Sequence, residues 1–255
     1  GDGTGLYSAD LTQYTTDRNI IQFYVEAITN AQSTFQPIYG PDRPAMWIVD
    51  NRTMPSVLLR ERFIVSEHDR RALTSDNSNG AGAAFDYNFP RMSNHFFNAT
   101  FIANESEIYY NAEIRKSGSP FTRATNSAID HGKWKLPGDR LFRNRRRSVI
   151  DASGTSQGSG PPRFYDDRIA RYFLYQLGHP INEMEFTHTV INDDTIRSRE
   201  SHEPISNDFL NRNFKEGSDG TLFRIDDEWR FTSDDGSSRS SRNADWSYKD
   251  TDNPT

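Results

Sequence analysis

A serine in a glycine-rich segment is the first residue whose setting could support catalysis. Residues 154–158 read Gly-Thr-Ser-Gln-Gly and match G-x-S-x-G, the pattern that places a nucleophilic serine between a strand and a helix in serine hydrolases. A strand is expected just before it, over residues 147–151. The Ser-Gly-Pro-Pro that follows at 159–162 delays any helix, so the serine would not lie at the positive end of a helix. We therefore interpret the segment as a glycine-serine loop, with a hydrolase as the rival interpretation.

Residues that bind metal ions are present but lack a recognisable spacing. The six histidines form no H-E-x-x-H motif and no pair four residues apart. Asp226, Asp227, Asp234 and Asp235 could offer oxygen ligands to calcium or magnesium, but their spacing is not that of an EF-hand. A solvated acidic loop is the expectation for this region, and no metal site is predicted.

The composition excludes several classes of protein. The chain has 255 residues, enough for one large domain or two small ones. It has no run of about 18 apolar residues, so no membrane-spanning helix is predicted. A net charge of -6 argues against a general attraction to nucleic acid, and the arginines within residues 143–147 are expected to form a solvated turn. Cysteine is absent, which excludes disulfides and thiolate metal sites. The mean hydropathy of -0.84 predicts long polar loops around a modest core.

Periodic patterns predict the elements that must position any functional side chain. Residues 19–29 alternate between apolar and polar side chains, as in a half-buried strand. Further strands are predicted at 45–49, 57–65, 96–102, 107–115 and 184–190, with turns at 104–106 and 192–194. Helices are predicted at 164–177, ended by Gly178, and at 207–214. Residues 66–95 are expected to form a flexible loop. The expected fold is α+β, with antiparallel β-sheets on which these two helices pack.

The order of these elements resembles the kinase family of spore-coat protein H. Residues 203–230 carry a glutamate, the run DFLNRNF, a glycine turn and a strand ending at Asp226, where the family has a Glu, a "dFLkr.f" helix, a glycine turn and an "LYk.D" strand. Residues 115–120 are similar to its "vRlkGss" segment, and residues 133–142 to its "Kksfki…lf" segment. The resemblance covers residues 45–255 and implies an atypical kinase-like fold. Residues 1–44 resemble the tail of a β-sandwich-like module of a large bacterial surface protein.

The resemblance implies a site that binds ATP and magnesium. Lys135 and Arg115 would contact the phosphates, since phosphoryl transfer depends mainly on positioning and charge stabilisation. Glu203 would orient the lysine through an ion pair, and Asp226 would approach the metal. The alternative for Lys135 and Arg115 is an exposed position on a strand, and for Glu203 a surface position beside Pro204.

The expected function is that of the front part of a secreted or cell-surface protein kinase-like protein. Its expected partners are a protein substrate and neighbouring domains of a larger chain, with no nucleic acid and no membrane span. The family's magnesium-binding and acceptor-facing residues follow the "LYk.D" strand and have no counterpart before Thr255, so the region is expected to be incomplete at its C-terminus and inactive alone. The competing function is a non-catalytic extracellular structural or adhesive module that retains the fold. Residues 195–199 support it, because they are polar where the family has "G.Y".

Overall fold

The computed structural model describes residues 8–14, 16–55, 57–74, 94–117, 131–152, 166–216, 222–226 and 245–249. The chain divides into two compact units, residues 1–204 and 205–255. The G-x-S-x-G segment, the glycine-rich part of the loop predicted at 66–95 and the glycine turn at 217–220 lie outside the described residues. The strand predicted before the G-x-S-x-G segment is present at Arg147–Asp151.

The first unit is built mainly of strands. Its strands are β1 (Ile20–Phe23), β2 (Val25–Ile28), β3 (Ser33–Gln36), β4 (Ala45–Ile48), β5 (Leu59–Ile64), β6 (Phe97–Ala103), β7 (Glu107–Lys116), β8 (Gly132–Lys135), β9 (Arg147–Asp151), β10 (Met184–Ile191) and β11 (Arg197–His202). Its helices are α1 (Glu67–Thr74) and α2 (Asp166–Gln176), with short 3-10 turns at Thr12–Tyr14 and Gly40–Asp42. The second unit contains α3 (Asn207–Asn213) and the antiparallel pair β12 (Leu222–Asp226) and β13 (Asp245–Lys249). Both the helix at 207–214 and the strand ending at Asp226 were predicted and are confirmed.

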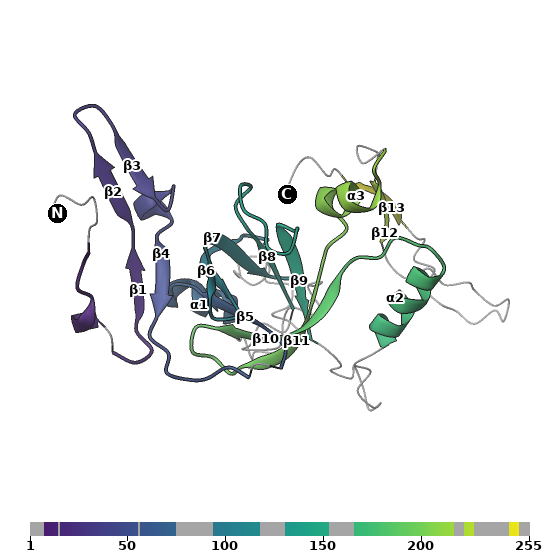
Figure 1. Cartoon of the computed structure of the whole chain (residues 1–255), viewed down its shortest axis with the longest axis horizontal. Coiled ribbons are helices and arrows are strands. Elements are labelled where there is room, and N and C mark those ends of the chain that lie inside the picture. The colour runs from purple at the N-terminus through teal and green to yellow at the C-terminus, as the bar shows by residue number, and fades with distance from the viewer. Residues whose placement is uncertain are drawn as a thin grey trace. The chain divides into compact units, whose positions relative to one another are not determined.

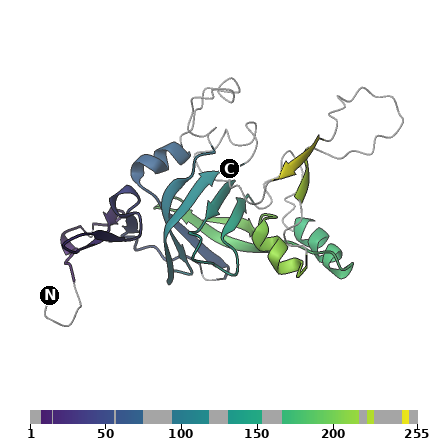
Figure 2. The ribbon, with the colours of Figure 1, turned by 90° about the horizontal axis from the view of Figure 1, so that it is seen from above.

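The main feature of the first unit is a closed barrel of the strands β5 to β11 (Figures 1 and 2). Their order around the barrel is β10-β11-β9-β8-β7-β6-β5. Neighbouring strands are antiparallel except for β5 and β10, which run parallel and close the barrel. The predicted mixture of strands and helices is therefore confirmed. The expectation of purely antiparallel sheets is wrong at this one pair, which joins strands that lie far apart in the sequence.

Inward-facing side chains fill much of the barrel with an aromatic core. The ring of Phe101 on β6 stacks on Phe63 of β5 at 5.0 Å between centroids, and on Trp134 of β8 at 4.9 Å. Phe142, which follows β8, meets the same ring edge-on at 5.3 Å. All four side chains are almost completely buried. Because aromatic side chains bury large areas and interact with one another, this cluster is expected to be a main source of the barrel's stability.

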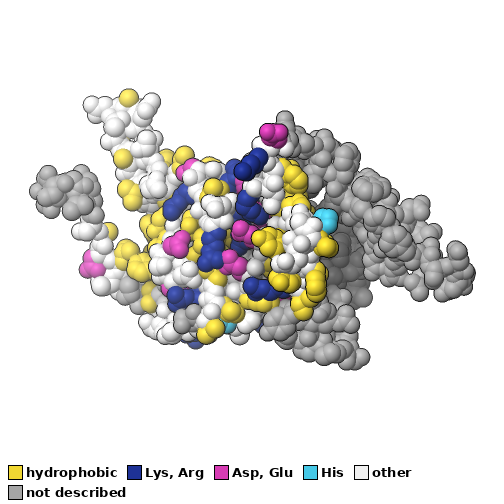
Figure 3. Space-filling view, turned by 45° about the vertical axis from the view of Figure 1, so that its right-hand side comes forward, with side chains coloured by type: hydrophobic (Ala, Val, Ile, Leu, Met, Phe, Trp, Pro, Cys, Tyr) yellow, Lys and Arg dark blue, Asp and Glu magenta, His cyan; other side chains and the backbone are white. Residues whose placement is uncertain are grey.

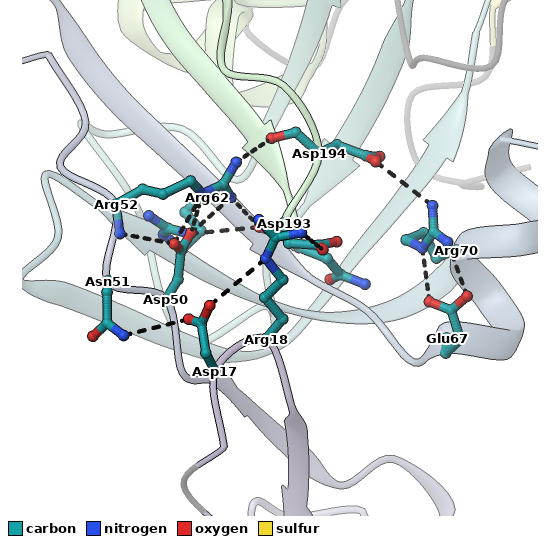
Figure 4. Close-up of polar contacts among 11 residues, drawn as sticks. Asp17, Arg18, Asp50, Asn51, Arg52, Arg62, Glu67, Arg70, Asp193 and Asp194 are labelled. Carbon is teal, nitrogen blue, oxygen red and sulfur yellow. Dashed lines mark hydrogen bonds and ion pairs between the residues drawn. The ribbon is translucent and has the colours of Figure 1, made fainter.

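The strand β4 connects the N-terminal part to the outside of the barrel. It pairs with β1, and its residues Met46 and Ile48 pack on Ile64 of β5. Just after β4, Oδ2 of Asp50 lies 2.7 Å from guanidinium nitrogens of both Arg52 and Arg62 (Figure 4). The domain boundary predicted after residue 44 thus falls between β1 and β4, two strands that pair with each other.

Two segments differ from the local predictions. Residues 19–29 form two strands, β1 and β2, which separate at Tyr24, and β2 pairs with β3 in an exposed hairpin. The predicted loop at 66–95 begins with the helix α1. Ser66 caps this helix, since its Oγ accepts a hydrogen bond from the backbone N of Asp69 at 3.1 Å. The Ser-x-x-Asp spacing was the signal that could have predicted α1.

The helix α2 forms where it was predicted, but its surroundings differ. Gly178 follows it with φ of 80°, in agreement with the predicted stop. Its apolar side chains do not pack on the barrel sheet, because Tyr172, Phe173 and Leu177 are 59%, 60% and 73% exposed. The periodicity predicted the helix correctly, but it does not specify what covers the apolar side. Among the described helices, none is long and apolar enough to cross a membrane.

Candidate functional site

Arg115 and Lys135 lie close together on the outer wall of the barrel. In the pairing of β7 with β8, Arg115 is opposite Lys133 and Glu113 is opposite Lys135. Residues two apart on a strand, and residues directly opposite on its neighbour, share one side of a sheet. Trp134, between the two lysines, points into the core. The two residues predicted to contact phosphates are therefore diagonal neighbours on the outer side of the sheet. Arg115 is buried and the side chain of Lys135 is partly exposed, so the alternative of an exposed strand position is wrong for Arg115.

One aromatic ring lies against both cations. The guanidinium carbon of Arg115 is 5.0 Å from the ring centroid of Phe96, and Nζ of Lys135 is 4.5 Å from the same centroid. Arg115 also donates to Oδ1 of Asn94 at 2.6 Å. Cation-π contacts hold long side chains in place at a modest energetic gain. The ring therefore holds two positive charges next to each other in spite of their mutual repulsion.

Glu113 is the carboxylate shared by the cations of this region. Its Oε1 lies 2.8 Å from a guanidinium nitrogen of Arg43, and its Oε2 lies 2.5 Å from Nζ of Lys135. Burial lowers the pKa of Lys135, and the charges of Arg147 and Arg43 lower it further. A depressed lysine pKa means that the cationic form is disfavoured by its surroundings. An added anion would relieve this effect.

These residues form a local concentration of positive charge, which we call the basic face. It consists of Arg43, Arg115, Lys133, Lys135 and Arg147 around the carboxylate of Glu113, and the alternation of β9 places Asp151 on the same side of the sheet as Arg147. The net charge of the whole chain is -6, so the basic face differs in sign from the average surface. On the side of the molecule drawn in Figure 3, basic and acidic side chains are interspersed rather than separated. On the side that Figure 3 draws, positive charge therefore does not form a continuous basic surface.

Glu203 lies elsewhere in the barrel. Its side chain is fully buried, so the alternative of a surface glutamate is wrong. Its Oε2 accepts a hydrogen bond from the backbone N of Glu183 at 3.3 Å. Glu203 directly follows β11, and β9 separates β11 from β8, which carries Lys135. The carboxylate paired with Lys135 is that of Glu113 instead, so the structure brings together Arg115 and Lys135 but not Glu203.

Asp226 belongs to the second unit. It ends β12 opposite Asp245 of β13. Within the described residues there is no group of three or more histidine, aspartate or glutamate side chains that could hold a metal ion. The predicted approach of Asp226 to magnesium stays a prediction.

Two members of the site were not identified from the sequence. The alternation of β7 places Glu113 on the same side as Arg115, which was a signal for its membership. Phe96 carried no comparable signal, because it precedes β6 and meets the cations only through the packing of three strands. A comparison with protein-family models finds no match for the chain, and no curated protein matches it.

Proposed function

We propose that the basic face binds the phosphates of ATP, and that the chain belongs to a secreted or cell-surface kinase-like protein of the spore-coat protein H type. The observation that carries the proposal is that Arg115 and Lys135 both contact the ring of Phe96. Two ordered cations on one wall can contact adjacent phosphate groups, which magnesium bridges in nucleotide complexes. In this proposal the barrel is the phosphate-binding part of an atypical kinase-like fold.

Titration with magnesium ATP tests the proposal. Lys135→Met and Arg115→Met should each weaken binding about 10- to 100-fold, since a charged hydrogen bond contributes about 1.5–3 kcal/mol. Arg71→Met is the matched control, because Arg71 is an arginine of α1 with a side chain 76% exposed. Its affinity should equal that of the wild type. Absence of binding by the wild-type chain, or equal affinity of all variants, would refute the proposal.

Variants of the two glutamates test which carboxylate forms the functional ion pair with Lys135. Glu113→Gln should tighten binding, since it removes the carboxylate that competes with phosphate for Lys135 and Arg43. Glu203→Gln tests the orienting role that the resemblance implies. A loss similar to that of Lys135→Met would support this role. Unchanged affinity would remove Glu203 from the site and leave the basic face intact.

A non-catalytic structural or adhesive module is the second candidate. The observation that favours it is the place of residues 197–202, which form β11 and pair with both β10 and β9. The polar segment that departs from the family pattern thus contributes to the barrel wall. For this function, the chain should bind no ATP.

A further inference from the structure

One sector of the barrel interior is polar. Glu61 of β5, Ser148 of β9 and Ser201 of β11 are buried there. Oγ of Ser201 lies 2.9 Å from Oε1 of Glu61 and 2.8 Å from Oγ of Ser148. Oγ of Ser148 donates in turn to the backbone O of His202 at 3.0 Å. These contacts form a chain of hydrogen bonds across three strands.

A count of protons indicates the state of Glu61. Each of the three hydrogen bonds in this series needs its own proton, and the two serine hydroxyls supply one each. The carbonyl oxygen of His202 supplies none. Ser201 donates to Oε1 of Glu61 and Ser148 donates to His202, so the contact between the two serines has no proton of its own while Glu61 is ionised, and a proton on Glu61 would complete the series. Burial raises the pKa of Glu61 to about 7, against the hydrogen bond from Ser201 and the charge of Arg145. Both observations favour the neutral form of Glu61 below about pH 7.

Arg145 places a guanidinium group in the same interior. It is fully buried, and its Nε and both Nη atoms form no hydrogen bond with any residue in the part of the chain that the structure describes. Its charge acts on Glu61, so the two side chains are near each other. A neutral Glu61 does not balance this charge. A buried cation without a partner is strongly unfavourable, so Arg145 is suited to bind an anion.

We propose that Arg145 anchors a buried site for a small oxyanion, of the phosphate or sulfate type, inside the barrel. The planar guanidinium group donates from fixed positions that match the oxygens of such anions. Arg143 and Glu185 form an ion pair with side chains 43% and 28% exposed, and both act on Glu61.

Other charged groups face the same interior and have partners. Arg199 and Glu203 lie on the same side of β11 as Ser201, by the alternation of the strand. Both have interactions of their own, and Oε2 of Glu203 accepts from Glu183. The proposed anion site lies inside the wall and the basic face lies outside it. The two proposals can therefore fail independently.

Thermal unfolding in sodium sulfate tests the proposal, at constant ionic strength maintained with sodium chloride. Bound sulfate should raise the melting temperature of the wild type with a logarithmic dependence on concentration. Sulfate also stabilises proteins in general, and Arg145→Met measures this background. The variant should lose the specific rise and, in sulfate-free buffer, should be at least as stable as the wild type. Lys135→Met should keep the specific rise.

A second pair of variants keeps the test decisive. Arg145→Lys retains the charge but not the planar group, so it should fold and respond to sulfate more weakly than the wild type. Glu61→Gln imitates the neutral acid, so its response at pH 8 should equal its response at pH 6, whereas the wild type should respond more strongly at pH 6. An equal sulfate response in wild type and Arg145→Met would overturn the proposal. So would a failure of both Arg145 variants to fold, because it would reveal a structural partner.

Discussion

The substitution Asp50→Asn should destabilise the first unit through the ion pairs that surround Asp50 (Figure 4). The carboxylate receives hydrogen bonds from Arg52 at 2.7 and 2.9 Å and from Arg62 at 2.7 Å. The side chains of Asp50 and Arg62 are only 5% and 3% exposed. Arg62 also contacts Glu105, at 3.1 Å. Asparagine has nearly the same shape as aspartate, so the substitution removes the charge and one of the two acceptor oxygens and leaves packing unchanged.

The magnitude follows from the burial of the pair. Removing one partner of a buried ion pair costs about 3–5 kcal/mol, because the other charge stays buried without compensation. Glu105 still balances part of the charge of Arg62, so we expect the lower end, about 3 kcal/mol. For a unit of this size the melting temperature should fall by about 6–12 °C.

The assay is thermal unfolding of Asp50→Asn beside Asp17→Asn. Asp17 also pairs with an arginine, Arg18, but at 3.7 Å and with side chains 54% and 63% exposed. The control should therefore lose at most about 1 kcal/mol. The hydrogen bonds from Arg52, with those from Arg62, hold the pKa of Asp50 well below its usual value. Its contribution is present above about pH 4 and is lost as the pH falls further, so the difference between the variant and the wild type should shrink in acid. If both variants lost the same stability at pH 7, the reasoning would be refuted.

Three further predictions concern the core, the turns and pH. Trp134→Ala should cost about 3–5 kcal/mol in urea unfolding, and a loss below about 1 kcal/mol would mean that the aromatic core does not depend on it. Gly40→Ala should destabilise far more than Gly178→Ala in thermal unfolding, because φ is positive at both, but only at Gly40 would a Cβ lie 2.6 Å from the ring of Phe35. Equal losses of stability in the two variants would show that the ring of Phe35 moves to make room for the added Cβ. Burial raises the pKa of Glu61 to about 7, above the value that it has in the unfolded chain. The free energy of unfolding should therefore decrease as the pH rises from about 4.5 to about 7. Glu61→Gln should remove that decline, and an unchanged pH profile would contradict the assignment.

Local patterns predicted most of the strands. The alternating segment at 107–115 became β7, and the polar link before it became a turn in which Asn104 and Glu105 have positive φ. Both features depend on residues close in sequence, where side-chain alternation and turn preferences act. At 19–29 the same alternation predicted one strand too few, because Tyr24 interrupts it and the second half pairs with β3.

The functional residues were identified only in part. The resemblance selected Arg115 and Lys135, and the structure places both on one wall. It also selected Glu203 as the partner of the lysine, whereas Lys135 pairs with Glu113, directly opposite it in the register of β7 and β8. The buried pair of Glu61 and Arg145 was not predicted, because the arginine cluster at 143–147 was interpreted as a solvated turn.

The order of residues alone determined where most of the described strands and the helices α2 and α3 form, and which side chains share one side of each strand. The tertiary structure alone decided that β5 meets β10, that Arg145 enters the interior, and that the apolar side of α2 is exposed. The physical reason is the separation along the sequence over which each effect acts. Periodicity and turn preferences act over a few residues, whereas strand partners, their register and the burial of a charge depend on contacts between segments far apart in the chain.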